Sequence, residues 1–320
     1  MSALKDLSHL KQSHIAFLLK RIGAIVGGKK NEQLRRLNHE LVRPRLVLGK
    51  DKDGVERARI LSVDMGIKNL GYCLTKVNIH PDTKTTKPSF LVATWASGPL
   101  FPETNKAEES NEDPFDLYSP SNFSKTALDL VKNVFLPLRP THILIEKQRF
   151  RTGGQPMIQE WTVRVNKLES MLWSILATHN EYNEFKIQTS AVDPARTTKF
   201  WVPVDKAVKN EEKVMADTKK LKINLVKSWI SKEKLPEEID LQFGVQAHPM
   251  MNFFATGKRF AKGEDTPKKR DDLADCLLQA AAKVIWELNR RQIADMSVKQ
   301  IELLCKSADA ATANSSASTG

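Results

Sequence analysis

The stretch Ile60-Leu-Ser-Val-Asp64-Met-Gly-Ile-Lys-Asn-Leu-Gly-Tyr-Cys-Leu74 contains two apolar segments on either side of a short polar turn. The first segment predicts a strand that ends on the carboxylate of Asp64, and Gly66 allows the turn into a second strand. A third strand is predicted at 90–95. Strands joined by short turns pair in antiparallel fashion. The sequence therefore predicts a sheet that presents an acid at the end of its first strand.

Beyond these strands, helical and strand patterns alternate, which predicts an α/β fold with a mixed five-stranded sheet flanked by helices. Ser124 is the expected N-cap of a helix over 123–138. The other expected strands are 142–146 and 186–190, and the other expected helices are 158–179, 206–229, 271–290 and 292–306. The acidic segment 103–116 is expected to be an exposed insertion, and 232–270 is expected to be a loop.

Composition and charge restrict the class of protein. The chain of 320 residues is 41% hydrophobic and has 50 Lys and Arg against 38 Asp and Glu, a net charge of +12. An excess of positive charge favours phosphate-rich partners such as nucleic acids. No run of about 18 apolar residues predicts a membrane span. The three cysteines lack metal-ligand spacing, so they are expected to be buried or incidental free thiols.

The N-terminal residues 1–42 predict two short helices around a Gly-Lys turn. Asn31 is the expected N-cap of the second helix, and Lys29 and Lys30 lie in the turn. The interpretation is a small helical DNA-binding module, and the alternative is a helical cap that only packs on the main domain. Residues 43–56 are expected to be a linker, 57–306 the main domain, and 307–320 a disordered tail rich in Ser, Thr and Ala.

Acidic residues recur at the ends of apolar elements. Glu146 ends the strand 142–146, while Asp271, Asp272 and Asp275 lie in the first turns of a helix and can share one face. Ligands of open α/β sheets bind beyond the carboxyl ends of the strands, so Asp64 and Glu146 are expected to meet there. Taken singly, each acid could be a helix-dipole partner, a cap or a salt-bridge partner.

Clustered carboxylates need a counter-charge, and their oxygens suit Mg²⁺ or Mn²⁺. Two such ions about 4 Å apart would favour hydrolysis of a phosphodiester bond. The hypothesis is therefore a nuclease with two metal ions in each active site.

Three motifs occur in a characteristic order: Val63-Asp64-Met-Gly-Ile-Lys-Asn-Leu-Gly71, Ile145-Glu146-Lys-Gln-Arg149 and Lys268-Lys-Arg-Asp-Asp272-Leu-Ala-Asp275. In this order they resemble the ribonuclease H-like nucleases, and among these the RuvC-related mitochondrial Holliday junction resolvases. The N-terminal helices resemble the SAP module, which fits the same family.

The resemblance implies a ribonuclease H-like fold and a homodimer that nicks four-way DNA junctions symmetrically in mitochondria, although the chain has no clear presequence. It also implies metal-binding, catalytic carboxylates at Asp64, Glu146, Asp272 and Asp275, with Asp271 as an alternative to Asp272.

Basic and aromatic residues around the acids are expected to contact DNA. The candidates are Gln148, Arg149, Phe150, Arg151, Arg164, Lys219, Lys220 and Lys222, together with Lys29 and Lys30. Arginine suits bidentate phosphate contacts, and Phe150 could stack at a branch point. The simpler interpretation is a solvated helix face for the lysines and for Arg164, and a core position for Phe150. Trp161 lies on the predicted apolar stripe and is expected to be a core or dimer contact.

Two other functions remain open at the level of sequence. One is a ribonuclease H-like nuclease that cuts RNA in an RNA/DNA hybrid, and the other is a non-catalytic DNA-binding scaffold. Cleavage of a junction beside a linear hybrid would distinguish the first from the leading hypothesis, and substitution of Glu146 would test the second.

Overall fold

The computed structural model describes residues 5–80, 87–101, 117–148, 159–202, 211–258, 260 and 269–317, without the side chains of 211–216 and 311–317. Arg149, Phe150, Arg151 and the predicted insertion 103–116 lie outside the described residues. The chain divides into two compact units. One comprises Leu48–Ala280, and the other combines Met1–Val47 with Ala281–Gly320.

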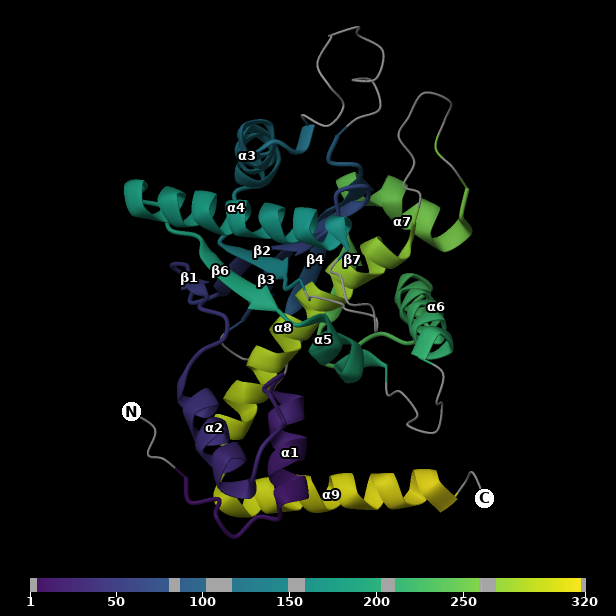
Figure 1. The fold of residues 1–320 in the computed structure, drawn as a ribbon. Coiled ribbons are helices and arrows are strands. Elements are labelled where there is room, and N and C mark those ends of the chain that lie inside the picture. Colours follow the sequence, from purple (N-terminus) through teal and green to yellow (C-terminus); the bar gives the residue numbers. More distant parts are fainter. Residues whose placement is uncertain are drawn as a thin grey trace, which may run out of the picture. The chain divides into compact units, whose positions relative to one another are not determined.

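A mixed sheet forms the centre of the first unit (Figure 1). Its strands are β1 (Gly49–Lys50), β2 (Glu56–Asp64), β3 (Leu70–Ile79), β4 (Ser89–Gly98), β5 (His142–Glu146), β6 (Gln188–Val192) and β7 (Asp240–Phe243). The order is β6-β5-β2-β3-β4-β7, and β1 pairs with β2. The pairs β1–β2, β2–β3 and β3–β4 are antiparallel, whereas β2–β5, β5–β6 and β4–β7 are parallel. The five predicted strands are present, and β1 and β7 enlarge the sheet to seven.

Side-chain alternation along the strands divides the sheet into two faces. Leu61 and Val63 of β2, with Ile143 and Ile145 of β5, belong to a core that helices α3 (Pro120–Asp129) and α4 (Glu160–Tyr182) complete. Asp64 and Glu146 therefore project from the opposite face, where helix α8 (Asp271–Asp295) begins. The hydrophobic alternation of the strands thus selects the face on which the acids appear.

Helix α3 differs from its prediction in cap and in length. Ser119 is the N-cap and accepts a hydrogen bond from the backbone N–H of Asn122, so the expected cap at Ser124 is wrong. The helix begins earlier because Pro120 suits the first helical position. After Asp129 the chain continues as a π-helix (Leu130–Phe135) and a short 3-10 helix (Leu136–Leu138), which ends before the left-handed Arg139.

The segment 232–270 is not a simple loop, contrary to our prediction. It contains β7, a 3-10 helix (Val245–Ala247) and helix α7 (His248–Thr256). Leu241 is buried in β7, and α7 buries Met250, Phe253 and Phe254. These elements are too short to show a periodic pattern, and β7 is ordered by pairing with β4, which lies far away in the sequence. Gly257, with a φ of 77°, ends α7.

Helices α5 (Pro194–Trp201) and α6 (Glu211–Ile230) also belong to the first unit. The indole N–H of Trp201 donates to the carbonyl of Leu278 in α8 at 2.9 Å, and its ring packs edge-on against Trp229 of α6 at 4.9 Å. These contacts connect both helices to the start of α8.

The second unit contains α1 (Gln12–Arg21), α2 (Lys30–Val42), α9 (Val298–Ala317) and the later turns of α8. Its core combines the N-terminal helices with Ile293, Ile301 and Cys305, so the N-terminal helices share a core with C-terminal ones. Helix α2 starts at Lys30, and Lys29 is its N-cap. The backbone N–H of Lys29 donates a hydrogen bond to the side chain of Glu32. The expected cap at Asn31 is therefore wrong.

The predicted disorder of 307–320 is also wrong for most of this segment, because α9 continues to Ala317. Alanine has the highest intrinsic helix propensity, and the alanines of this segment favour the extension of the helix. The resemblance of the N-terminal helices to a SAP module stays a prediction.

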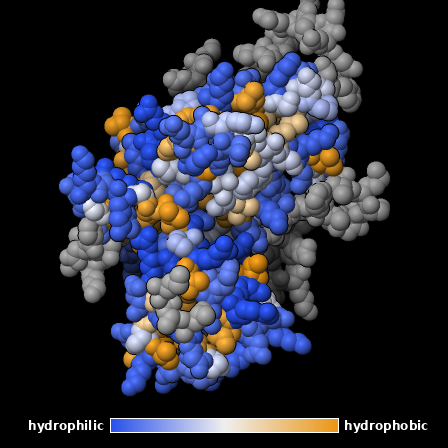
Figure 2. Space-filling view, turned by 90° about the vertical axis from the view of Figure 1, so that its left-hand side faces the viewer, coloured by the Kyte–Doolittle hydropathy of each residue, from blue (hydrophilic) through white to orange (hydrophobic). Residues whose placement is uncertain are grey.

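Among the described residues, no helix is long and apolar enough to cross a membrane. The face shown in Figure 2 is mainly hydrophilic, with hydrophobic residues scattered in small groups. Such scattered residues are normal on a protein surface and need no partner.

Candidate active site

Asp64 and Glu146 meet at the end of two parallel strands. Val63 of β2 is paired with Ile145 of β5, so the next residue of each strand projects from the same face. Glu146 acts on Asp64 both through its charge and through hydrogen bonding, and both effects raise the pKa of Asp64. Asp64 is only 8% exposed. The predicted convergence of these two acids is therefore present in the fold.

The start of α8 approaches the sheet closely enough to add two more acids. The indole N–H of Trp95 on β4 donates to the carbonyl of Leu273 at 2.9 Å. Gly71, the β3 partner of Asp64, leaves room for the helix, since a Cβ there would stand 2.8 Å from the carbonyl oxygen of Asp272. Asp272 and Asp275 both act electrostatically on Asp64. Carboxylates of two strands and one helix thus form one cluster.

Burial and the crowding of the carboxylates raise the pKa values of Asp64, Asp272 and Asp275. Burial, followed by repulsion from Glu146 and Asp275, raises the pKa of Asp64 well above its usual value. Burial, followed by the charge of Asp271, raises the pKa of Asp272 to about 6. Burial also raises the pKa of Asp275, although Lys222 opposes the change. These are the shifts that several carboxylates in one poorly solvated place must show.

Two lysines of α6 face the acids of α8. Lys222 is almost fully buried, and its ammonium donates to Oδ1 of Asp275. Lys219 lies one turn earlier and donates to Oδ2 of Asp271 at 2.6 Å. Burial tends to raise the pKa of Asp271, but the hydrogen bond and charge of Lys219 outweigh it, so that this pKa is lowered. Asp271 is therefore paired with a lysine.

The donor set fits a hard divalent cation. Oδ2 of Asp272 is buried, and no hydrogen-bond partner for it exists among the residues that the structure describes. Carboxylate oxygens that lack partners are ligands of the kind that Mg²⁺ and Mn²⁺ prefer. As they stand, however, no three His, Cys, Asp or Glu side chains of the described ranges are arranged to hold a metal ion. The acids are assembled, but some of their oxygens are engaged by each other and by lysine.

The other candidate DNA contacts are more dispersed. Gln148 follows β5 directly, and its side-chain amide donates to the carbonyl of Glu146 at 3.4 Å. Arg164 of α4 pairs with Glu160 and stacks over Tyr118 at 3.7 Å from the ring centre. Lys220 is exposed on α6 between the two paired lysines. Lys29 and Lys30 belong to the second unit, at the start of α2.

Two positions at the site were not identified from the sequence as site residues. They are Gly71 and Trp95, which position α8, and a glycine inside a strand was the available signal, since it often marks a close backbone approach. Trp161, which was expected to be a core or dimer contact, is 37% exposed and has the ammonium of Lys68 at 5.5 Å from its ring centre. A core position for Trp161 is therefore wrong. Its place in the first turn of α4 leaves it beyond the buried stripe.

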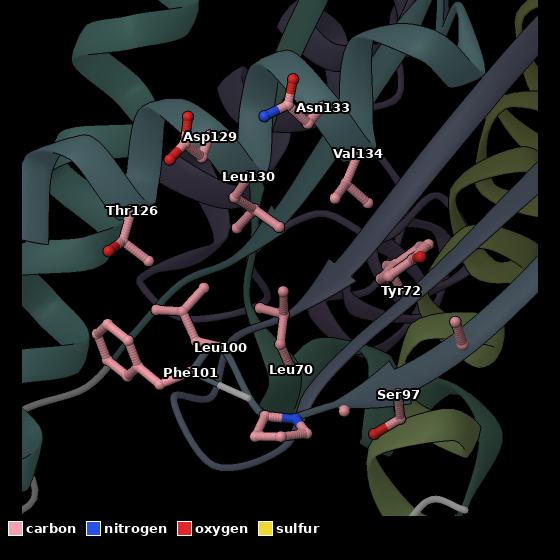
Figure 3. Close-up of a pocket in the computed structure, with 13 residues that line it drawn as sticks. Leu70, Tyr72, Ser97, Leu100, Phe101, Thr126, Asp129, Leu130, Asn133 and Val134 are labelled. Carbon is pink, nitrogen blue, oxygen red and sulfur yellow. The ribbon is translucent and has the colours of Figure 1, made fainter. Parts of the chain in front are cut away.

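A pocket of about 500 Å³ lies elsewhere, between β3, β4 and the helical segment 126–134 (Figure 3). Leu70, Leu100 and Leu130 give it an apolar wall, while Asp129 and Asn133 are polar residues at its helical side. Leu70 and Tyr72 pack against the core on the α3 face of the sheet. The pocket is thus separate from the carboxylates, and it contains none of the predicted site residues.

Cys73, Cys276 and Cys305 are free and buried, as the sequence predicted. Burial, followed by the neighbouring Cys73, raises the pKa of the Cys276 thiol, which favours its protonated form.

The mixed sheet, with acids of two adjacent strands and one helix in a single cluster, defines a ribonuclease H-like α/β protein. The fold is similar to the crystal structure of the yeast mitochondrial Holliday junction resolvase Ydc2. The TM-score is 0.58 at 23% sequence identity, and the match covers 93% of this chain and 98% of that one. The predicted fold class is therefore confirmed.

Residues 60–293 match the family described as mitochondrial resolvase Ydc2 / RNA splicing MRS1, and this chain belongs to that family. Two relatives are named cruciform cutting endonuclease 1, mitochondrial. The Schizosaccharomyces pombe protein is 27% identical over 285 residues, which cover 88% of this chain and 94% of the relative. The Saccharomyces cerevisiae protein is 25% identical over 270 residues, which cover 75% and 72%.

Proposed function

We propose that this protein is a structure-selective DNA endonuclease that resolves four-way junctions by paired nicks. Family membership and the names of its two relatives support this activity. The observation that carries the proposal is the convergence of Asp64, Glu146, Asp272 and Asp275 on one face of the sheet. An acid cluster of this kind serves hydrolysis of a phosphodiester bond by water, without a covalent enzyme intermediate.

The four acids are the proposed ligands of two Mg²⁺ or Mn²⁺ ions in each active site. Bound ions would supply a nucleophilic water and neutralise charge that develops on the leaving oxygen. Direct electrostatic interaction with Asp64, and an unpartnered buried oxygen, favour Asp272 over Asp271 as the ligand. Asp271 instead holds Lys219. Asp271 and Asp272 are therefore proposed to have different roles, although both are aspartates of the first turn of α8.

DNA contacts are proposed for residues of both units. Gln148 lies next to Glu146, and Lys220 is exposed on α6. Lys29 and Lys30 would contribute phosphate contacts from the second unit, and Arg164 could contribute only by leaving Glu160 and Tyr118. Arg149, Phe150 and Arg151 lie outside the described residues, and their DNA contacts rest on the sequence alone. Phosphate contacts supply affinity, while selectivity for a junction comes from its shape.

A homodimer with two active sites is part of the proposal, since symmetric nicking of a four-way junction requires two sites. We also propose a mitochondrial location, because both relatives are named as mitochondrial proteins.

The test is a nicking assay on a fixed four-way junction, a linear duplex and an RNA/DNA hybrid, each with Mg²⁺ or with EDTA. Metal-dependent nicking of the junction, with little cleavage of either linear substrate, is expected. Preferred cleavage of the hybrid would point instead to a ribonuclease. The family description also includes RNA splicing. If the protein binds the junction but cleaves none of the three substrates, a non-catalytic nucleic-acid scaffold would be favoured.

A further inference from the structure

A buried lysine among buried acids requires an explanation. The Lys222 residue is 8% exposed, and its ammonium contacts Asp275. Transfer of an ammonium from water into a protein interior is unfavourable unless a paired anion offsets the lost hydration. Lysine more commonly keeps its charged end in water while only its stem is buried. The burial of the Lys222 ammonium is therefore explained by its contact with the Asp275 carboxylate.

Asp275 belongs to two groups of contacts at once. It is the partner of Lys222, and it is one of the acids that act on Asp64. Lys219 lies one turn away on α6 and holds Asp271, which is not among the proposed metal ligands. The two lysines are thus similar in spacing and chemistry, but only Lys222 binds an acid of the proposed metal site.

An ammonium and a divalent cation compete for the same oxygen. Both need the lone pairs of Oδ1 of Asp275, and both neutralise the same repulsion among the acids. In this structure the ammonium of Lys222 holds that oxygen.

We propose that Lys222 is the internal counter-cation of the metal-free site, and that it must release Asp275 before the site binds its divalent ions. This inference rests on the proposed metal-dependent function. Lys222 is then a positioning residue that determines when Asp275 is available to a metal ion.

The experiment measures Mn²⁺ affinity by isothermal titration calorimetry on the full chain without DNA, so that it does not depend on cleavage. Lys222→Gln removes the competing cation, and roughly tenfold tighter Mn²⁺ binding is expected. Lys219→Gln leaves the Lys222–Asp275 contact intact but removes a charge that acts on Asp272 and Asp275, so a rise in Mn²⁺ affinity of only about two- to threefold is expected. Lys220→Gln removes an exposed charge and should change the affinity by about twofold or less.

A second variant covers the case in which Lys222→Gln fails to fold. Lys222→Arg keeps the charge and can grip the carboxylate with two hydrogen bonds, so severalfold weaker Mn²⁺ binding than in the wild type is expected. Circular dichroism of each variant checks the fold.

The outcomes separate the inference from the function on which it rests. Tighter binding in Lys222→Gln than in both controls, or weaker binding in Lys222→Arg, supports the role of Lys222. If the wild type binds Mn²⁺ and the Lys222 variants bind it no differently from the Lys219 control, the inference is overturned while the metal-dependent function stands. An absence of Mn²⁺ binding in the wild type and in every variant would overturn both.

Discussion

Gly71 of β3 and Asp272 of α8 are in direct contact, and a Cβ at Gly71 would stand 2.8 Å from the Asp272 carbonyl oxygen. The same glycine is paired with Asp64 across the β2–β3 ladder. One position without a side chain therefore determines how closely the helix-borne acids approach the strand-borne acids.

Gly71→Ala should weaken catalysis by pushing the start of α8 away from the sheet. The added methyl group meets backbone, which cannot rotate away, so we expect a loss of stability of about 1–3 kcal/mol. The nicking rate should fall by roughly tenfold or more, because small misplacements of catalytic groups are costly. Junction nicking and urea denaturation check both effects. Gly98→Ala is the control, since nothing lies within 4 Å of its added Cβ. Equal rates for the two variants would contradict the role of Gly71.

Glu146→Gln should abolish nicking while junction binding stays nearly unchanged. The amide keeps the shape of the side chain but removes a negative charge from the proposed metal site. A fall in the nicking rate of about a hundredfold or more is expected, because metal-stabilised charge in the transition state is lost. Gel-shift titration beside the cleavage assay makes the comparison. A variant that nicks at the wild-type rate would show that the site has been assigned wrongly.

Asp272→Asn should stabilise the metal-free protein at pH 7.5 but not at pH 4. The folded-state pKa of Asp272 is raised to about 6 from 3.8, so the fold favours the protonated carboxyl over the carboxylate. The stabilisation that the protonated form provides is fully present below pH 4 and is lost as the pH rises through 6. With allowance for its partial exposure, the gain at pH 7.5 is about 1–2 kcal/mol. Thermal unfolding in EDTA at both pH values measures it.

Asp271→Asn provides a control of opposite sign for this pH experiment. The pKa of Asp271 is lowered, so its ionised form stabilises the fold at neutral pH and this contribution is lost as the pH falls through the folded-state value. Asp271→Asn should therefore lower the unfolding temperature at pH 7.5. The same sign for both substitutions would refute the distinction between the two acids.

Glu287→Gln should strongly destabilise the second unit. The buried Glu287 carboxylate accepts hydrogen bonds from Arg290, Arg291 and the backbone N–H of Arg45. Loss of one partner of a buried ion pair leaves uncompensated charge and costs about 3–5 kcal/mol. Urea denaturation followed by circular dichroism measures it. Glu160→Gln, in which the exposed partner of Arg164 is altered, should cost less than about 1 kcal/mol. A small effect at Glu287 would argue against this assignment.

Junction binding should weaken steeply with salt, with a log–log slope of several units, because counterions are released from phosphates. The net charge of +12 supports this expectation. Lys220→Gln should lower the slope by about one unit if its exposed ammonium contacts a phosphate. Fluorescence anisotropy from 50 to 300 mM salt, roughly the range in which such slopes are measured, gives both values. A flat response would remove the electrostatic part of the proposal.

Much of the fold was predictable because its central elements carry strong local patterns. The strand that ends at Glu146 has the predicted bounds, and the hairpin after Asp64 pairs as expected. The strand β7 and the helix α7 were missed because they are short and depend on partners distant in sequence. The extension of α9 was missed because a composition of small residues was interpreted as disorder, although alanine favours helices.

The sequence by itself determined that acids end two apolar strands and open an apolar helix, because alternation and helical periodicity are local properties of the chain. Only the tertiary structure decided which acids meet. Strand pairing and the contact at Gly71 bring Asp272 to Asp64, whereas Lys219 and Lys222 engage Asp271 and Asp275 from another helix. Electrostatic interactions depend on distance in space. Asp64 and Asp275 lie 211 positions apart in the chain, so they come close together only when the sheet and its helices pack.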